Sequence, residues 1–178
     1  MTKDHMIYHL GRLEEMRKSI EQKIQTLILD NADDAREGFR GIEEDADTLE
    51  EDRVQALMSI AEDAGLDIDF ADALSTIQLE AEDISSTANE AGGVLEEMFD
   101  PDGDEVQGVV EDYLGTIDTS NEAIYKAVGE IKEGLKKTRG WRKRDEGGDY
   151  DFIVGRVTNK AAKKKAVKNV AIKKKQQG

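Results

Sequence analysis

The sequence contains no cysteine, one proline, one tryptophan and two histidines among its 178 residues. Without cysteine the chain has no disulfide framework, no cysteine-ligated zinc finger and no thiol nucleophile. No apolar run approaches the roughly 20 residues that a membrane-spanning helix requires. Residues 1–15 are charged and amphipathic, unlike a secretory signal peptide. These absences predict a chain that does not span a membrane and is not secreted by a signal peptide.

Basic residues are missing from the middle of the chain, where no Lys or Arg lies between Arg53 and Lys126. Residues 1–139 hold 13 basic and 36 acidic side chains, a net charge of −23. Residues 140–178 hold 12 basic and 4 acidic side chains, a net charge of +8. Blocks of like charge often serve as interaction segments, and the alternative is a solvated acidic face followed by a disordered tail. The uneven charge is the main clue to function that the sequence offers.

Apolar side chains recur at helical spacing along four stretches of the chain. The stretches cover residues 3–29, 35–64, 70–98 and 106–135. Each would form a helix about 40–50 Å long, and short connections make successive helices antiparallel. The sequence therefore predicts an all-α protein, an elongated bundle or pair of hairpins of about four long helices. The steps in the last stretch approach the heptad of a coiled coil.

Short polar residues and glycines predict where these helices begin, end or bend. Gly65 suits the left-handed position that follows a helix C-terminus, and Asp69 is the expected N-cap of the third helix. Gly92-Gly93 predicts a kink or a frayed last turn, and the capping-box pattern of Thr119–Glu122 allows a break in the fourth helix. The segment Asp100-Pro101-Asp102-Gly103 predicts the turn between the last two helices.

The apolar stripes contain many alanines and few aromatic residues, which make up 5% of the chain. The first stripe includes Met16, and the second includes Leu49 and Val54. Such helices can pack closely but bury little area each, so an isolated bundle has a small stability margin. This pattern favours an oligomer or a larger protein assembly over an isolated monomer.

The C-terminal forty residues differ from the acidic helical body, residues 1–139. Residues 140–158 predict a linker with a short extended segment at residues 150–154, and residues 159–178 are a Lys-rich tail with too few aliphatic residues for a core. The candidate nucleic-acid or polyanion-binding residues are Arg139, Trp141, Arg142, Lys143, Arg144, Lys160, Lys163, Lys164, Lys165, Lys168, Lys173, Lys174 and Lys175. Lysines neutralise phosphates without reading base sequence, although an acidic protein or an anionic membrane surface offers the same charge.

Trp141 is the residue of this set with the most specific chemistry, because it lies between Arg139 and a run of three basic residues. A nucleic-acid base can stack on the indole while the neighbouring cations hold phosphates. The alternative is that Trp141 closes the end of the helical bundle.

The turn before the fourth helix carries carboxylates at the spacing of a calcium-binding EF-hand loop. Asp100, Asp102, Asp104 and Glu111 occupy positions 1, 3, 5 and 12 of such a loop. Position 6 holds Glu105 instead of the glycine that the EF-hand requires, and acidic residues also favour an ordinary helix N-terminus. These four residues are a weak calcium candidate.

The two histidines, His5 and His9, lie four residues apart and would share one face of the first helix. Two such side chains can begin a zinc site, but the chain offers no further histidine or cysteine as a third ligand. Neither histidine has the Glu-x-x-His spacing of a di-iron bundle, and both lie too close to the N-terminus for a credible Ser-His-Asp grouping. We expect a non-enzymatic protein without a metal or a cofactor.

In charge layout and helicity the chain resembles viral scaffolding and internal virion proteins, which are helical, charge-rich, cysteine-free and often carry a basic docking segment. The resemblance implies a structural or assembly protein, cytoplasmic or virion-associated, whose body docks in an oligomer or larger complex. Its basic tail would bind an acidic protein surface, packaged nucleic acid or the acidic body of a neighbour. The alternative is a nucleic-acid-associated protein or polyanion mimic, in which residues 54–125 compete for basic partners. A calcium-responsive helical module is the third hypothesis.

Overall fold

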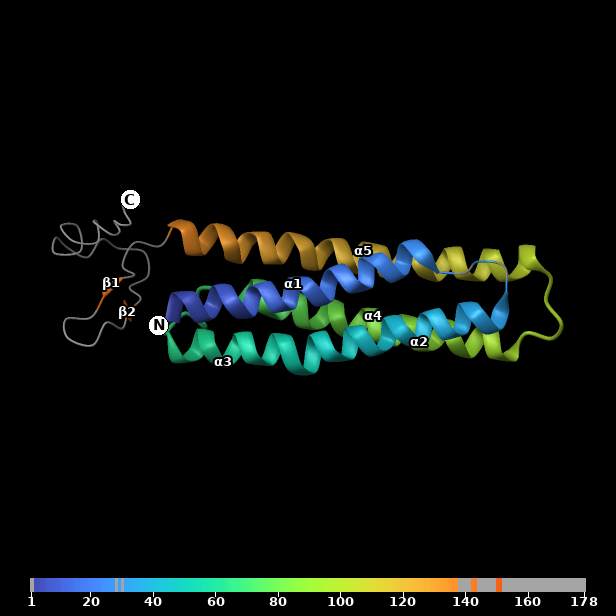
Figure 1. Cartoon of the computed structure of the whole chain (residues 1–178), viewed down its shortest axis with the longest axis horizontal. Coiled ribbons are helices and arrows are strands. Elements are labelled where there is room, and N and C mark those ends of the chain that lie inside the picture. The colour runs from blue at the N-terminus through green and yellow to red at the C-terminus, as the bar shows by residue number, and fades with distance from the viewer. Residues whose placement is uncertain (1, 28, 30, 138–141, 144–149, 152–178) are drawn as a thin grey trace.

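Four long helices make up most of the protein in a computed structural model that describes residues 2–27, 29, 31–137, 142–143 and 150–151 (Figure 1). The helices are α1 (Thr2–Thr26), a continuous run of α2 (Ala32–Thr48), the π-helix η1 (Leu49–Val54) and α3 (Gln55–Asp63), then α4 (Ala71–Glu97) and α5 (Gly103–Lys137). Two short strands, β1 (Arg142–Lys143) and β2 (Tyr150–Asp151), pair antiparallel. The predicted all-α bundle of about four long helices is confirmed.

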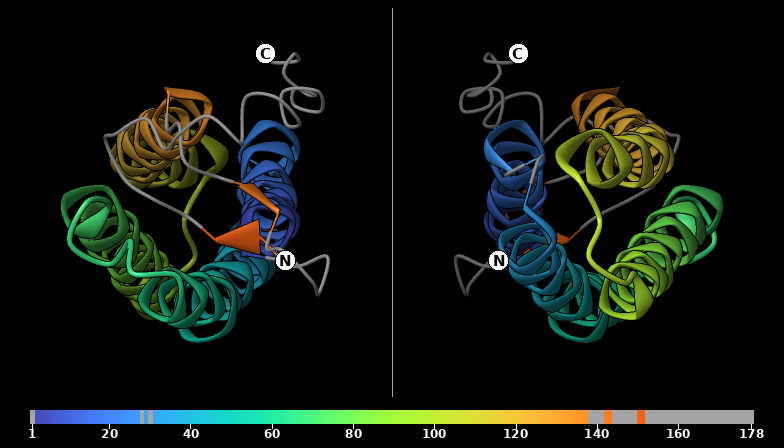
Figure 2. Two further views of the ribbon diagram at one scale, coloured as in Figure 1. Left: turned by 90° about the vertical axis from the view of Figure 1, so that its left-hand side faces the viewer. Right: turned by 90° about the vertical axis from the view of Figure 1, so that its right-hand side faces the viewer.

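Successive helices run in opposite directions and form a rod (Figure 1). The α4–α5 turn and the connection from α1 to α2 lie at one end, and the α3–α4 connection and the C-terminal end of α5 lie at the other. Viewed along the rod, the order around its axis is α1, α2 with α3, α4 and α5 (Figure 2). Helix α4 packs most extensively against α5 and α2, and α1 contacts both α2 and α5.

The core is one continuous column of aliphatic side chains along the rod, to which every helix contributes. Its largest fully buried side chains are Phe39, Met6, Leu13, Ile20, Ile42, Leu49, Leu57, Leu66, Ile77, Ile84, Ile117 and Ile124. Buried alanines such as Ala46, Ala81 and Ala88 let the helices approach closely. Because burial of apolar area is the main favourable term in folding, this column holds the acidic helices together.

The end of α3 follows the prediction made for Gly65, which has a φ angle of +75°. The Gly65 N–H donates to the Glu62 carbonyl at 3.0 Å, and the Leu66 N–H donates to the Ala61 carbonyl at 2.7 Å. This pair of hydrogen bonds is the Schellman motif, and the buried Leu66 side chain supplies the apolar contact that usually accompanies it.

The π-helix η1 interrupts the second long helix, and the sequence contains the reason for it. Leu49 and Val54 are both fully buried although they are five residues apart. A regular α-helix would turn one of them away from the core, whereas a π-bulge accommodates one extra residue within the helix. The bulge therefore keeps the apolar stripes of α2 and α3 on the same face of the rod.

Several predicted helix boundaries are wrong in detail. The N-cap of α4 is Phe70 rather than Asp69, and it makes no side-chain capping bond. The Phe70 ring is buried against Gly134 of α5, so packing rather than capping determines where α4 begins. Helix α4 does not fray at Gly92-Gly93 but continues to Glu97, whereas the alternative of a kink there stays a prediction. Helix α5 runs unbroken through Thr119–Glu122. Thr119 Oγ1 donates to the Gly115 carbonyl of the same helix at 3.0 Å and caps nothing.

Candidate functional site

The ion pairs among the described residues involve Arg17 and Lys23 of α1, Arg36 and Arg40 of α2, Arg53 of η1 and Lys136 of α5. Arg17 contacts Glu14 at 2.7 Å and Glu21 at 3.2 Å, and Lys23 of α1 contacts Asp45 of α2 at 2.6 Å. Among the described residues, by contrast, no carboxylate of α4 forms an ion pair, and none does in α5 before Glu133. The exposed surface of α4 and of the first two thirds of α5 therefore presents negative charge that the described part of the protein does not neutralise.

The hydroxyl group of Tyr113 on α5 lies beside carboxylates of this acidic surface. Its hydroxyl donates a hydrogen bond to Glu90 Oε2 of α4 at 3.3 Å. Partial burial raises the pKa of Tyr113, and the negative charges of Glu90 and Asp112 raise it further. The raised pKa means that the Tyr113 hydroxyl keeps its proton, and its hydrogen bond to Glu90, more firmly than a free tyrosine would.

The α4–α5 turn is ordered by its own side chains. Asp100 adopts a left-handed φ angle of +48°, and Asp102 is the N-cap of α5. The Glu105 N–H donates to Asp102 Oδ1 at 2.8 Å, and the Asp102 N–H donates to Glu105 Oε1 at 3.1 Å. This reciprocal capping box satisfies two backbone donors at the start of α5. Both side chains are therefore already bonded to backbone.

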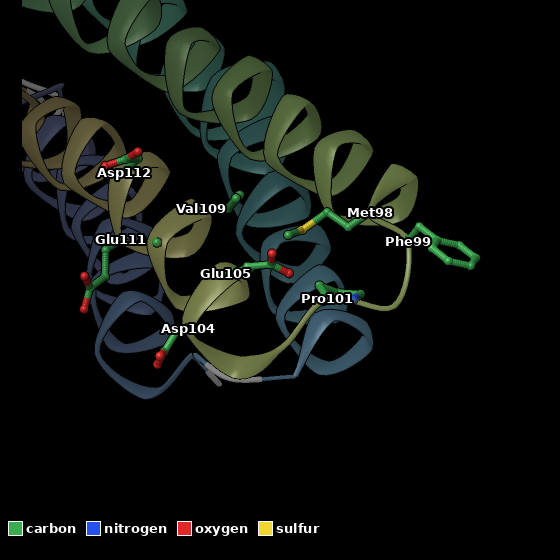
Figure 3. A pocket seen from close by; sticks show the side chains of 9 residues that line it. Met98, Phe99, Pro101, Asp104, Glu105, Val109, Glu111 and Asp112 are labelled. Carbon is green, nitrogen blue, oxygen red and sulfur yellow. The ribbon is translucent and has the colours of Figure 1, made fainter.

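The structure does not bring the four calcium candidates together. Because α5 begins at Gly103, Asp104 and Glu111 lie on its surface, where Figure 3 shows both pointing outward, while Asp102 caps the helix. Among the described residues there is no group of three or more acidic, histidine or cysteine side chains arranged to hold a metal ion. His5 and His9 do share a face of α1, with ring centroids 6.4 Å apart. Among the described residues, however, they belong to no group of three or more side chains that could hold a metal ion.

An open hollow of about 640 Å³ lies beside this turn, between the end of α4 and the first turns of α5 (Figure 3). Its apolar lining is Met98, Phe99, Pro101 and Val109, and its acidic lining is Asp104, Glu105, Glu111 and Asp112. Met98 and Val109 face each other between the two helices, whereas the Phe99 ring projects away from the rod and is 95% exposed. The hollow combines an apolar floor with a negatively charged rim.

Of the residues predicted to bind polyanions, the structure describes Arg142 and Lys143. They form strand β1, which pairs with β2 next to α1. Arg139, Trp141, Arg144 and all lysines of the 159–178 segment lie outside the described residues, as do residues 152–154 of the predicted extended segment. Their predicted roles stay predictions.

Sequence reasoning missed a buried polar cluster on α1. Arg17 is 5% exposed, its Nε and Nη2 atoms both donate to Glu14 Oε2, and its guanidinium lies 5.0 Å from the centre of the Tyr125 ring of α5. The stripe of α1 passes through Leu13, Arg17 and Ile20, and Met16, the expected core residue, is only half-buried. Arg17 lies four residues after Leu13 and three before Ile20, a helical spacing that predicts its burial. A charged side chain, however, is rarely buried, so the spacing alone did not indicate it.

Phe99 was also missed, because it follows α4 and belongs to no apolar stripe. Its signal was a large aromatic residue immediately before an Asp-Pro turn in a chain with few aromatics.

None of the described helices is sufficiently long and apolar to cross a membrane. Comparisons with protein-family models, with curated proteins and with solved structures found no match to this chain. The functional argument therefore rests on the geometry of the bundle and its charges.

Proposed function

We propose that the protein is a non-enzymatic structural or assembly protein. Its helical body docks in an oligomer or a larger complex, in the cytoplasm or in a virion, and its basic C-terminal region tethers it to an anionic partner. The observation that carries this proposal is the unneutralised acidic surface of α4 and α5 beside an aliphatic core that does not need it for stability. A surface of one sign of charge steers partners of the opposite sign and rejects partners of the same sign.

The shape of the bundle supports the same proposal. Helices of this length expose much surface for the core they bury, and the α4–α5 turn presents apolar groups, Met98 and Phe99, next to carboxylates. Large exposed apolar side chains rimmed by polar groups are typical of protein–protein contacts. The lining of the hollow thus favours binding of a protein segment.

Sedimentation velocity of the full chain, over a concentration series and from about 50 mM to about 1 M NaCl, tests the assembly role. We expect self-association at low salt that weakens as the Debye length falls from about 14 Å to about 3 Å. The matched control is the same chain in sodium sulfate at equal ionic strength, which screens charge equally and strengthens apolar association. A chain that is monomeric at every salt and concentration, and that binds no acidic protein, would contradict the proposal.

A nucleic-acid-associated protein or polyanion mimic is the second candidate, favoured by the net charge of +8 on residues 140–178. Fluorescence anisotropy with a labelled oligonucleotide, repeated across salt, would reveal binding whose affinity falls steeply with salt. Replacement of Lys163, Lys164 and Lys165 by Gln should then lower the affinity and reduce the salt slope. Affinity unchanged by that replacement would exclude the tail as the nucleic-acid contact.

A further inference from the structure

We propose that the hollow at the α4–α5 turn binds the Lys-rich segment 159–178 of a second copy of the chain, so that copies associate head to tail. The inference rests on the proposed assembly function and adds the contact that produces it. The hollow offers three complementary features: an apolar floor at Met98 and Val109, the exposed Phe99 ring, and a rim of carboxylates.

The composition of the segment matches the hollow. Residues 159–178 contain eight lysines and no acidic residue, and they interleave these lysines with Val167, Val170 and Ile172. The lysines can reach the rim carboxylates while the aliphatic side chains cover the floor and the Phe99 ring. Each exposed charge pair alone is weak, so the apolar contact supplies the specificity that a diffuse acidic surface lacks.

The partner carboxylates are available. Among the described residues Asp104, Glu111 and Asp112 have no basic partner, and Glu111 accepts only a hydrogen bond from Gln107 Nε2 at 2.9 Å. No Lys or Arg lies within the surrounding sequence from Val54 to Tyr125. A basic segment docking here therefore displaces no existing ion pair of the described chain.

Chain geometry favours a second copy over the chain's own segment. Helix α5 has 35 residues and is about 52 Å long, and the hollow lies at its N-terminal end whereas residue 159 follows its C-terminal end. A fully flexible chain of 21 residues, the number from 138 to 158, would span on average about 25 Å, and the pairing of β1 with β2 within this segment shortens its reach. Reaching the hollow of the same chain would require about twice that span. A contact between opposite ends of a rod is heterologous, so it links copies head to tail into open chains or closed rings.

The test uses a hollow variant with Phe99→Ala, Glu111→Lys and Asp112→Lys, which leaves the capping residues Asp102 and Glu105 in place. The matched control carries Leu79→Ala, Glu82→Lys and Asp83→Lys on the exposed surface of α4, with the same change in charge and the loss of a less exposed apolar side chain. In sedimentation velocity at low salt we expect the hollow variant to self-associate at least tenfold more weakly than the control. Equal weakening of both variants would overturn the proposal, because it would show a response to net charge alone.

A mixing experiment separates this contact from other modes of assembly. The second component is a tail variant in which Lys163, Lys164, Lys165, Lys173, Lys174 and Lys175 are replaced by Gln. The hollow variant retains a tail and the tail variant retains a hollow, so each alone should be monomeric and their mixture should form dimers that extend no further. A mixture that stays monomeric would overturn the proposal. So would an unmodified chain that stays monomeric while the mixture forms dimers, because each chain would then bind its own tail.

The single variant Phe99→Ala tests the contact without disturbing the fold, since a side chain that is 95% exposed contributes little to the core. We expect it to weaken self-association several-fold with an unchanged melting temperature, and an unchanged association constant would count against the hollow. If the full chain assembles but the hollow variant assembles equally well, the hollow contact fails and the assembly function stands. If the full chain never assembles and binds no acidic protein, the proposed function itself fails.

Discussion

Helix α5 contacts α1 and α4 through different chemistry. The contact with α1 includes the buried Arg17, paired with Glu14 and stacked on Tyr125, and one turn away α5 buries Asn121 with its Oδ1 atom unbonded. Toward α4, α5 contributes aliphatic side chains to the core, and a hydrogen bond from the Tyr113 hydroxyl to Glu90 joins exposed polar groups of the two helices.

The difference shows how the helical body, residues 1–139, distributes its 13 basic side chains among 36 acidic ones. Lys23 joins α1 to α2 through Asp45, and Arg17, held by Glu14 of its own helix, lies over the Tyr125 ring of α5. Helices α4 and α5 pair through aliphatic side chains and need no cation. Their carboxylates remain available, which is the property that the proposed docking role requires.

Of the substitutions that test this difference between the two contacts, Arg17→Met is expected to have the largest effect on stability. The substitution leaves the Glu14 carboxylate, whose Oε1 atom already lacks a hydrogen bond, buried without its partner. Loss of one member of a buried pair costs about 3–5 kcal/mol. Urea unfolding followed by circular dichroism should show this loss of unfolding free energy.

The matched control is the double variant Glu14→Leu with Arg17→Met, which replaces the pair by apolar groups of similar size. It should recover most of the lost stability, because an apolar pair avoids the cost of burying the charges. If the double variant is as unstable as Arg17→Met, the attraction between Glu14 and Arg17 exceeds the cost of burying their charges, and the pair makes a net contribution to the unfolding free energy. A single variant as stable as the wild type would show that α1 does not depend on Arg17.

A smaller effect is expected at Gly134 of α5, against which the ring of Phe70, the N-cap residue of α4, packs. A Cβ atom placed there would lie 2.6 Å from Cε1 of the buried Phe70 ring. Gly134→Ala should therefore lower the unfolding free energy by about 1–3 kcal/mol, the usual cost of overpacking. The thermal midpoint, read by circular dichroism, measures it.

Gly129→Ala on the same helix is the control, since nothing lies within 4 Å of its added Cβ. It should raise stability by up to about 1 kcal/mol, because alanine favours the helix more than glycine does. Opposite signs for two identical substitutions five residues apart would confirm the close contact. A stabilising Gly134→Ala would mean that the ring moves aside freely.

The contrast between these two contacts also explains what the sequence could predict. The four helices, their antiparallel order and the Gly65 turn follow from local spacing and backbone preference, which a single chain segment contains. The N-cap at Phe70 and the burial of Arg17 depend on what another helix places opposite them, so no local pattern determines them. The step of five between Leu49 and Val54 was visible in the sequence, but only a structure shows that a π-bulge absorbs it. The hollow was out of reach because it forms only when α4 and α5 meet around an exposed Phe99.

The smallest effect concerns the repulsion within the acidic surface itself, at Glu50 of η1. Partial burial raises the pKa of Glu50, and the negative charges of Glu82 on α4, Glu51 and Asp47 raise it further. A carboxyl group whose pKa is higher in the folded than in the unfolded protein binds its proton more tightly when folded. The Glu50 charge therefore lowers stability as the pH rises above the unfolded pKa, and this penalty is absent at lower pH. Glu50→Gln should stabilise the protein at pH 7 by about 0.5 kcal/mol, the scale of like-charge pairs on helices. Thermal melts of both proteins at pH 7 and near pH 4 measure this difference, which should shrink at the lower pH. A gain in melting temperature that does not change with pH would arise from packing rather than charge. The control is Glu37→Gln, at an exposed position that forms an ion pair with Arg40, and it should not stabilise the protein.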